Sequence, residues 1–480
     1  MIIQGGMGVA ISNWRLASAV SRLGQLGVVS GTGLTRVLTA RLADGDPGAH
    51  MRRALESFRF PEAVEKALRR YFVPGGKASD APYKSPPAYT VRPPRFADQF
   101  TVIANYVEVF LAKQGHSRPV GINLLEKIQL PNLASIYGAM LAGVDYLLMG
   151  AGIPTQIAAV LDKLARHEPV SYRLDVLGMK PEDDARMHFD PERLFAGIAR
   201  RIGQLKRPKF IPIISSAVLA RALLKRSEGS VDGFVVEGPT AGGHNAPPRG
   251  PLLLNERGEP IYGERDLVDA EQMRGFGVPF WLAGGYGHPD RLRAALAAGA
   301  AGIQVGTPFA LCDESGMDPV LKRRVLREAC EGGALVLTSA TASPTGFPFK
   351  VLRLDGTLSD ERVRAARARV CDLCFLRTLF KKDDGSIGYR CPAGPVDDYV
   401  RNGGDAADTI GCVCLCNALN ATAGFPQWRE DGYVEPPIVT VGDDLTHIAP
   451  LARARGTGYS AADVIRHILN PVLAPSIAPS

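Results

Sequence analysis

The segment from Val235 to His244 places a carboxyl group, an imidazole and bare glycine backbone at the end of a strand. Two β-branched residues lead into Glu237, paired glycines follow at Gly242 and Gly243, and His244 closes the segment. Glycine lets the backbone approach a ligand closely because it has no Cβ, and imidazole exchanges a proton near neutral pH. The segment therefore predicts a cofactor-binding wall with an attached acid–base residue. A turn histidine bonded to a carbonyl is the alternative interpretation of His244.

Glycine clusters also follow other apolar runs. Gly284 and Gly285 come directly after Ala283, at the end of one run, and Gly306 with Thr307 follows the next. In a barrel of parallel strands, the loops after the last two strands often hold a phosphate through backbone N–H groups. These residues therefore predict a binding site for an anionic group, with tight βα turns as the alternative.

The elements that must position these residues are short β-rich runs that alternate with helical ones, which is typical of a parallel sheet. Eight such strands with helices between them predict an α/β fold, a (β/α)8 TIM-type barrel. Ser12 and Pro289 are expected to begin two of the helices. The candidate strands are Ile2–Gln4, Gly27–Ser30, Val120–Leu124, Val144–Met149, Phe210–Ile214, Gly233–Glu237, Phe280–Ala283 and Gly302–Val305.

Two regions interrupt the alternation and set the expected domain organisation. The first is a large insertion after the second strand, at about residues 35–118, and its Pro- and Gly-rich middle from Pro74 to Pro94 is typical of a long loop. The second begins near Asp355, where cysteines, charged helices and turns replace the βα pattern. We expect a cofactor-binding barrel over residues 1–355 and an α-helical, cysteine-containing C-terminal extension over residues 356–480.

Composition argues against two classes of partner. The formal charge of +7 is spread along the chain, and no Lys/Arg block with interleaved aromatic residues predicts nucleic-acid binding. No apolar run approaches the roughly 20 residues of a membrane helix. The amino terminus shows no secretory signal and the chain has eight cysteines, so we expect a cytoplasmic protein with reduced thiols.

Three groups of residues resemble the nitronate monooxygenases, formerly called 2-nitropropane dioxygenases. The resemblance covers roughly residues 1–350 and is carried by Gln4-Gly5-Gly6-Met7-Gly8, by Glu237 to Gly242-Gly243-His244, and by Ala283-Gly284-Gly285 with Gly306-Thr307. It implies an FMN-dependent barrel enzyme that acts on a small molecule. The flavin-dependent enoyl-ACP reductases are close relatives of this family.

The resemblance also implies a role for each residue. Gly6 and Met7 would line the flavin ring, and Asn123 would hydrogen-bond it. His244 would be the catalytic residue, either as a base or as a donor to the developing anion of the substrate. The FMN phosphate would be held by Gly242, Gly243, Gly284, Gly285, Gly306 and Thr307, and Glu237 and Ala283 lie in the same cofactor-binding runs.

Two departures from the family pattern leave the substrate open. Many members carry a lysine at the end of the fifth strand, where this chain has Ile214-Ser215-Ser216. The segment after His244 is longer than in the simplest members and resembles the enoyl reductases that accompany polyunsaturated fatty acid synthases. Our leading hypothesis is oxidation of alkyl nitronates or nitroalkanes with O2. The alternatives are an NAD(P)H-dependent enoyl-(acyl carrier protein) reductase and a flavin-binding scaffold without turnover, and a homo-oligomer stays open for each.

Cysteines near the carboxyl end of the chain form a separate candidate metal site. Cys-x-x-Cys is a frequent metal spacing, and zinc or an iron–sulfur cluster is conceivable on Cys371, Cys374, Cys391 and Cys414. The full spacing is not a standard ligand pattern, so we expect no metal and a lid with reduced thiols. The remaining histidines are expected at the surface: His50, His116, His167, His188, His288, His447 and His467.

Overall fold

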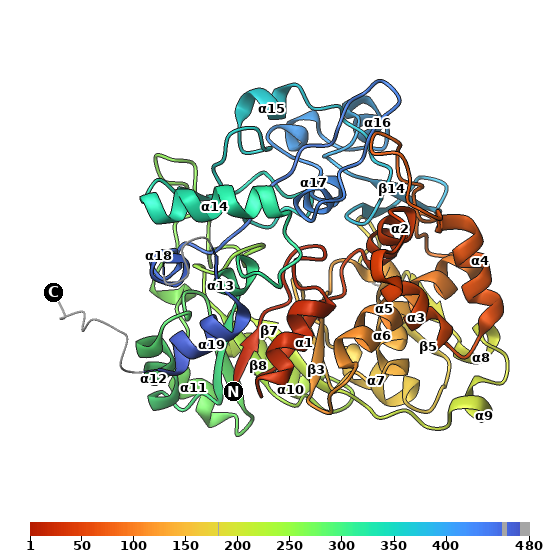
Figure 1. The fold of residues 1–480 in the computed structure, drawn as a ribbon, viewed down its shortest axis with the longest axis horizontal. Coiled ribbons are helices and arrows are strands. Elements are labelled where there is room, and N and C mark those ends of the chain that lie inside the picture. The colour runs from red at the N-terminus through yellow and green to blue at the C-terminus, as the bar shows by residue number, and fades with distance from the viewer. Residues whose placement is uncertain (181, 454–457, 471–480) are drawn as a thin grey trace.

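Eight parallel strands form a nearly closed barrel in the computed structural model, which describes residues 1–180, 182–453 and 458–470 (Figure 1). The strand order is β1-β10-β9-β8-β7-β4-β3-β2, and a bridge between Ile3 and Leu26 joins its two ends. All eight strands expected from the sequence are present, so the (β/α)8 fold is confirmed. The strands are β1 (Ile2–Gln4), β2 (Gly27–Ser30), β3 (Val120–Leu125), β4 (Tyr146–Gly150), β7 (Lys209–Ile214), β8 (Phe234–Glu237), β9 (Phe280–Ala283) and β10 (Gly302–Val305).

Alternation along the strands divides the hydrophobic core into two parts. Successive side chains of a strand point to opposite faces, so Val235 packs inside the barrel with Ile3 and Trp281, whereas Phe234 and Val236 pack outside against helices. The helices of the barrel layer are α1 (Trp14–Arg22), α6 (Gln129–Leu141), α7 (Ile157–Leu164), α10 (Ala217–Arg226), α11 (Ala270–Gly275), α12 (Pro289–Ala297) and α13 (Thr307–Ala310). Both faces of the sheet are therefore buried, which explains its continuous apolar runs.

The helix starts confirm one prediction and correct the other. Pro289 is the first residue of α12, as expected. Asn13 rather than Ser12 caps α1, because its side chain accepts a hydrogen bond from the Leu16 N–H. The Ser12 hydroxyl instead accepts from the Met7 N–H (2.9 Å) and donates to the Gly5 carbonyl (2.8 Å), and so fixes the loop after β1.

The insertion after β2 forms a helical layer followed by a long loop. Residues 72–94 contain no helix or strand, as the sequence predicts. Gln427, far along the chain, ties this loop to the layer, because it accepts from Arg36 Nη2 (2.9 Å) and donates to the Tyr83 carbonyl (3.1 Å). The insertion comprises α2 (Leu34–Ala43), the 3-10 turn η1 (Pro47–Ala49), α3 (His50–Glu56), α4 (Pro61–Tyr71) and α5 (Arg95–Lys113).

Three antiparallel hairpins were not expected from the sequence. They pair β5 (Val170–Arg173) with β6 (Arg186–Phe189), β11 (Val336–Ser339) with β12 (Phe349–Leu352), and β13 (Thr378–Lys381) with β14 (Ile387–Arg390). Each strand has only four residues, which is too short for a clear alternation in the sequence. Between β4 and β8 the chain also forms the short helices α8 (Pro191–Leu194) and α9 (Ile198–Ile202).

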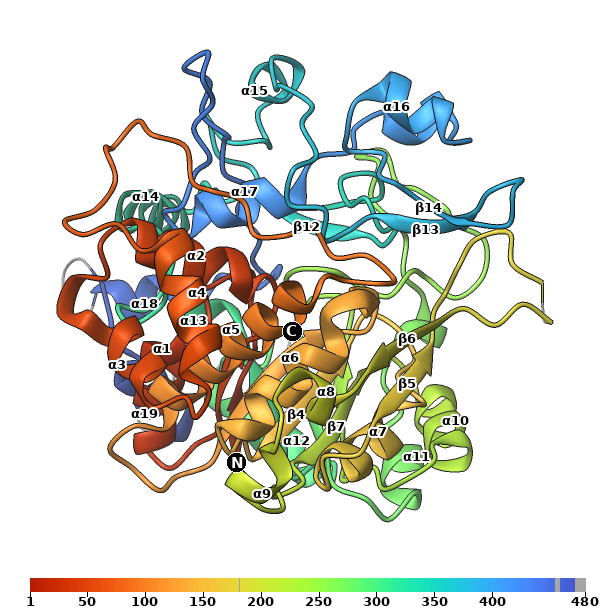
Figure 2. The ribbon, with the colours of Figure 1, turned by 90° about the vertical axis from the view of Figure 1, so that its right-hand side faces the viewer.

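The carboxyl-terminal part of the chain covers one end of the barrel, as Figure 2 shows. We call residues 336–453 the cover; they begin with the β11–β12 hairpin. The final helix α19 (Ala461–Leu469) packs against α1, α12 and α13 on the side of the barrel. The Pro/Ala/Ser-rich segment 471–480 lies outside the described residues. The other helical elements are η2 (Glu264–Asp266), α14 (Pro319–Glu331), α15 (Glu361–Ala365), α16 (Val396–Arg401), η3 (Ala406–Thr409), α17 (Leu415–Thr422) and α18 (Ile448–Arg453). Among the described helices, none has the length and apolarity needed to cross a membrane.

Candidate functional site

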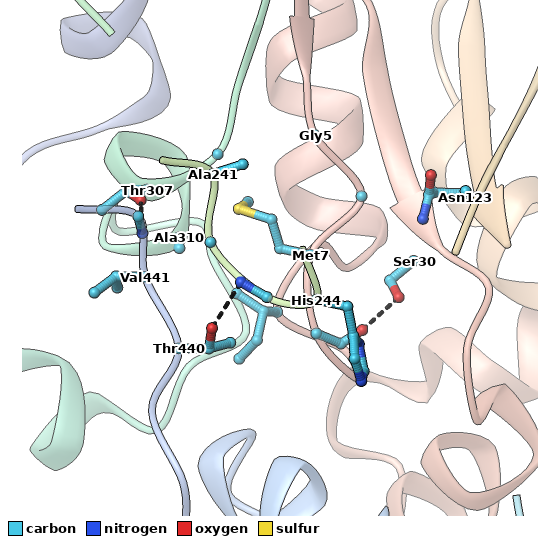
Figure 3. Close-up of a pocket in the computed structure, with 18 of the residues that line it drawn as sticks. Gly5, Met7, Ser30, Asn123, Ala241, His244, Thr307, Ala310, Thr440 and Val441 are labelled. Carbon is cyan, nitrogen blue, oxygen red and sulfur yellow. Dashed lines mark hydrogen bonds between the residues drawn. The ribbon is translucent and has the colours of Figure 1, made fainter. Parts of the chain in front are cut away.

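A cavity of about 240 Å³ lies between the carboxyl ends of the barrel strands and the cover. Figure 3 shows residues from several strand ends that face it, among them Met7, Asn123 and His244. Every site residue predicted from the sequence lines this cavity: Gly6, Met7, Asn123, Glu237, Gly242, Gly243, His244, Ala283, Gly284, Gly285, Gly306 and Thr307. The fold thus brings together residues as far apart in the chain as Gly6 and Thr307.

Several of the cavity glycines lie where no side chain fits. A Cβ at Gly6 would lie 2.2 Å from Asn123 Cβ, and a Cβ at Gly242 would lie 2.8 Å from the Val441 carbonyl carbon. Gly284 and Gly285 have φ angles of +96° and +70°, which other residues rarely adopt. The bare backbone at these strand ends is therefore required by close packing and by backbone conformation.

Two buried side-chain oxygens at the cavity have no hydrogen-bond partner within the described residues. They are Asn123 Oδ1 in β3 and Gln304 Oε1 in β10. An unsatisfied buried polar atom costs about 1–3 kcal/mol. A polar ligand in the cavity would remove this cost, so both atoms fit a bound cofactor.

His244 is held beside the cavity by residues of the cover. Its Nε2 lies 2.7 Å from Ser343 Oγ, and its ring meets the Phe349 ring edge-on with centroids 4.8 Å apart. Burial, and to a smaller extent the charge of Lys127, lowers the pKa of His244 to about 4. The imidazole is therefore neutral at physiological pH and can accept a proton from a ligand.

Glu237, at the end of β8, supplies a second titratable group. It lines the same cavity, and burial raises the pKa of its carboxyl to about 8. A carboxyl with this pKa is largely protonated at pH 7, so it can donate a hydrogen bond as well as accept one. The site thus pairs a neutral base with a neutral acid.

The loop after β3 brings a lysine that the sequence motifs did not single out. Lys127 Nζ donates to the Thr345 carbonyl (3.3 Å) and lies 3.7 Å from the centre of the Phe347 ring. Its charge is close enough to contribute to the lowered pKa of His244. Its position shortly after the end of the third strand could have indicated a role at the site. The family resemblance instead places a lysine at the end of the fifth strand.

The cover supplies two hydroxyl–amide contacts and an apolar wall. Thr440 Oγ1 accepts from the Gly243 N–H, and Thr307 Oγ1 accepts from the Gly442 N–H, each at 2.8 Å (Figure 3). These contacts fasten the segment around Val441 across the glycine-rich strand ends. The apolar wall consists of Phe375, Leu376, Leu415, Leu419 and Ile438. No sequence pattern marked these residues, because they lie in irregular segments or on short helices.

The expected surface position of the histidines is wrong in several cases. His167 is buried, with its ring between the Tyr137 hydroxyl (2.6 Å) and the Gly203 carbonyl (2.7 Å). His288 is also buried, and His447 and His467 are half-buried beside it. The local sequence pattern around each histidine predicts exposure. It contains no information on burial by elements that are distant in the chain.

All eight cysteines lie in the described part of the chain, and none forms a disulfide. Cys371, Cys374, Cys391, Cys414 and Cys416 line one small cavity of about 10 Å³ inside the cover. The four predicted candidate ligands are therefore neighbours. Burial raises the pKa of the nearby Cys412 thiol to about 12, so this sixth cysteine is a protonated core residue.

Comparison with known proteins identifies one part of the chain. Residues 198–358 match the family model described as nitronate monooxygenase. Over 159 residues the chain is 34% identical to the (3aS,4S,5R,7aS)-5-hydroxy-7a-methyl-1-oxo-octahydro-1H-indene-4-carboxyl-CoA dehydrogenase of Mycobacterium tuberculosis, which is 33% of this chain and 39% of that protein. Over 139 residues it is 32% identical to the nitronate monooxygenase of Pseudomonas aeruginosa, which is 29% of this chain and 38% of that protein. The chain thus spans about two fifths of the length of these relatives.

Solved structures resemble the chain over most of its length but at low similarity. FabK from Thermotoga maritima has a TM-score of 0.45 at 17% sequence identity, covering 98% of this chain and 91% of that one. A nitroalkane oxidase from Streptomyces ansochromogenes has a TM-score of 0.44 at 16% identity, covering 97% and 94%.

Proposed function

Because residues 198–358 form a nitronate monooxygenase family region, we propose that the protein is an FMN-dependent oxidoreductase that oxidises alkyl nitronates or nitroalkanes with O2. One observation carries the proposal. A neutral histidine and two residues that each carry an unsatisfied polar oxygen line a cavity whose other walls are glycine backbone and apolar side chains. This combination suits a planar cofactor with an anionic tail and a small substrate beside it.

The residues present fit FMN at both ends of the cavity. Gly6, Met7 and Asn123 would hold the ring, because Asn123 Oδ1 is an unused acceptor and Gly6 leaves no side chain in the way. The phosphate would lie against bare backbone at the ends of β9 and β10, which bear Gly284, Gly285, Gly306 and Thr307. Bound FMN would supply the electron transfer and the reaction with O2.

The protein's own residues would handle the proton and the charge of the substrate. His244 Nδ1 would accept the α-proton of a neutral nitroalkane, while the contact of Nε2 with Ser343 would orient the ring. For a nitronate, which is already an anion, the neutral imidazole would donate its N–H. The protonated Glu237 carboxyl would offer a further donor, and Lys127 a nearby positive charge.

We further propose that two parts of the chain have different functions. Residues 1–355 would bind the cofactor, and residues 356–480 would form an extension that closes the cavity. The eight thiols without a disulfide favour a reducing compartment, the cytoplasm. O2 and a small molecule would be the partners of the reaction.

A second candidate is an NAD(P)H-dependent reductase of enoyl thioesters. The apolar wall of the cover favours it, because a nitronate with a short alkyl chain needs less apolar surface than an acyl chain. One of the relatives is named for a carboxyl-CoA substrate. In this reaction His244 would donate to the thioester carbonyl oxygen. A flavin-binding scaffold without turnover would use the same cavity without either substrate.

Anaerobic titration of the purified protein separates these functions. We expect propionate 3-nitronate or nitroethane to bleach the flavin absorbance, air to restore it, and NADPH to leave it unchanged. Bleaching by NADPH alone would establish the reductase, and resistance to every donor would establish the scaffold. Chromatography of the released cofactor distinguishes FMN from FAD. Colourless protein that takes up neither would contradict the flavin proposal itself.

A further inference from the structure

Three histidines from distant parts of the chain converge beside the cavity. His288 immediately precedes α12, His447 immediately precedes α18, and His467 lies in α19. One ring atom of each lies within 4.8 Å of the corresponding atoms of the other two. Their ring centroids are 4.7, 5.8 and 6.1 Å apart. Such convergence of three imidazoles is an arrangement that a shared ligand would explain.

One nitrogen of this cluster lacks any partner. His467 Nε2 is buried and makes no hydrogen bond with any of the described residues. A ligand bound at this nitrogen would supply the missing partner.

Carboxylates contact the rings of His447 and His288. His447 Nε2 lies 2.8 Å from Asp444 Oδ2, which leaves His447 Nδ1 free for a ligand. His288 Nδ1 accepts from the Asp290 N–H (3.2 Å), and Asp290 Oδ2 lies 3.4 Å from the same nitrogen. Ligation through His288 Nε2 would place the ring proton on Nδ1, where it can turn to that carboxylate. A carboxylate behind a histidine is the usual support of a metal ligand.

We propose that His288, His447 and His467 bind one divalent transition-metal ion of the zinc class. Three imidazoles without a thiolate suit zinc, which bonds histidine nitrogen at about 2.0–2.1 Å. Tetrahedral geometry at that bond length sets the three nitrogens about 3.4 Å apart, so each moves inward by at most about 0.8 Å.

The ion would fasten the end of the chain to the barrel. Figure 1 shows α19 beside α12, and α19 packs on both α12 and α18. Asp444 and His447 also line the large cavity, together with Thr307 and Gly442. The metal would therefore hold the last segment of the cover at the Thr307 end of the cavity, away from His244. This site depends only on the three histidines and is independent of the proposed reaction.

Metal analysis of the purified protein, with matched variants, tests the site. We expect about one zinc per chain after dialysis against trace zinc. His467→Ala should lose it, and so should His288→Asn, in which asparagine can keep the helix-capping role of residue 288. His188→Ala at an exposed position and Cys414→Ser in the thiol cavity should retain it. Removal of zinc by a chelator should lower Tm of the wild type by roughly 2–6 °C and leave His467→Ala unchanged.

Two results would overturn the proposal. Wild-type protein that takes up neither zinc nor cobalt has no such site. Loss of metal in Cys414→Ser but not in the two histidine variants would make the thiols the ligands. Flavin reduction by nitronate does not enter these measurements, so failure of the metal site and failure of the proposed reaction are separate results.

Discussion

The carboxyl ends of the barrel strands, with the loops that follow them, are here called the rim. The rim and the cover form opposite walls of one cavity by different means. The rim contributes main chain, at glycines whose packing or φ angle excludes other residues, such as Gly6 and Gly284. The cover contributes side chains, such as Leu419 and the hydroxyl of Thr440. A cavity wall of glycine backbone suits a cofactor, which stays the same from one turnover to the next. A wall of side chains can be matched to a particular substrate by amino-acid substitution. We therefore propose that the rim binds the cofactor and that the cover selects the substrate.

The largest effect is expected at His244, where rim and cover meet. His244→Gln keeps a polar side chain near Ser343 but removes the base. We expect kcat with nitroethane to fall by about 10²–10⁴-fold, the usual contribution of a general base. The flavin spectrum should be unchanged. Full turnover in this variant would remove the histidine from the mechanism.

The next effect is expected at the rim, in Gly6→Ala. The new Cβ would lie 2.2 Å from Asn123 Cβ, and overpacking of this kind costs about 1–3 kcal/mol. If the strain falls on the bound state, Kd for FMN should rise by roughly 5- to 150-fold. Flavin titration of the apoprotein measures this.

Gly263→Ala is the matched control for that change. A Cβ at Gly263 meets no atom within 4 Å, and its φ angle is −117°. We expect unchanged flavin affinity. Circular dichroism shows whether Gly6→Ala is folded, and a folded variant with wild-type Kd would contradict the assignment of the rim to the cofactor.

The same difference explains how far the sequence predicts the structure. Rim residues were predictable because each follows an apolar run, and parallel strands bring all such positions to one end of a barrel. Glu237 and His244 were found in this way, as was Asn123. Local signals failed where two residues compete for one role. Ser12 and Asn13 are both good caps, and only the contact of Ser12 with the loop after β1 decides between them.

The side chains that the cover contributes to the site were not predictable from local pattern, although a lid was expected. Ser343 contacts His244 and Thr440 contacts Gly243 from irregular segments, and any exposed loop contains similar residues. The convergence of His288, His447 and His467 depends on the packing of α19 against α12, which no short-range signal encodes. Side chains that act through tertiary contacts between distant segments are found only once the fold is known.

A smaller effect is expected in the cover, in Leu419→Ala. This side chain forms part of the apolar wall, and its truncation removes contact area for the alkyl part of a substrate. Loss of about 1–2 kcal/mol of contact should raise KM for longer nitroalkanes by roughly 5- to 30-fold, with flavin affinity unchanged. Ile410→Ala, at a cover position that is 72% exposed, should change neither. Loss of flavin in Leu419→Ala would show that the cover also binds the cofactor.

The smallest effect is expected at Lys127, whose charge reaches His244 from the barrel side. His244 is active as a base when neutral, so kcat/KM should fall as pH decreases through its pKa of about 4. In Lys127→Met the protonated imidazole no longer meets that positive charge, so the pKa should rise and the acid limb should move to higher pH. Because burial is the larger cause of the lowered pKa, the limb should stay well below the ordinary value of about 6.5. Lys225→Met, at an exposed position on α10, should leave the profile in place. An unmoved limb in Lys127→Met would mean that burial alone keeps His244 neutral.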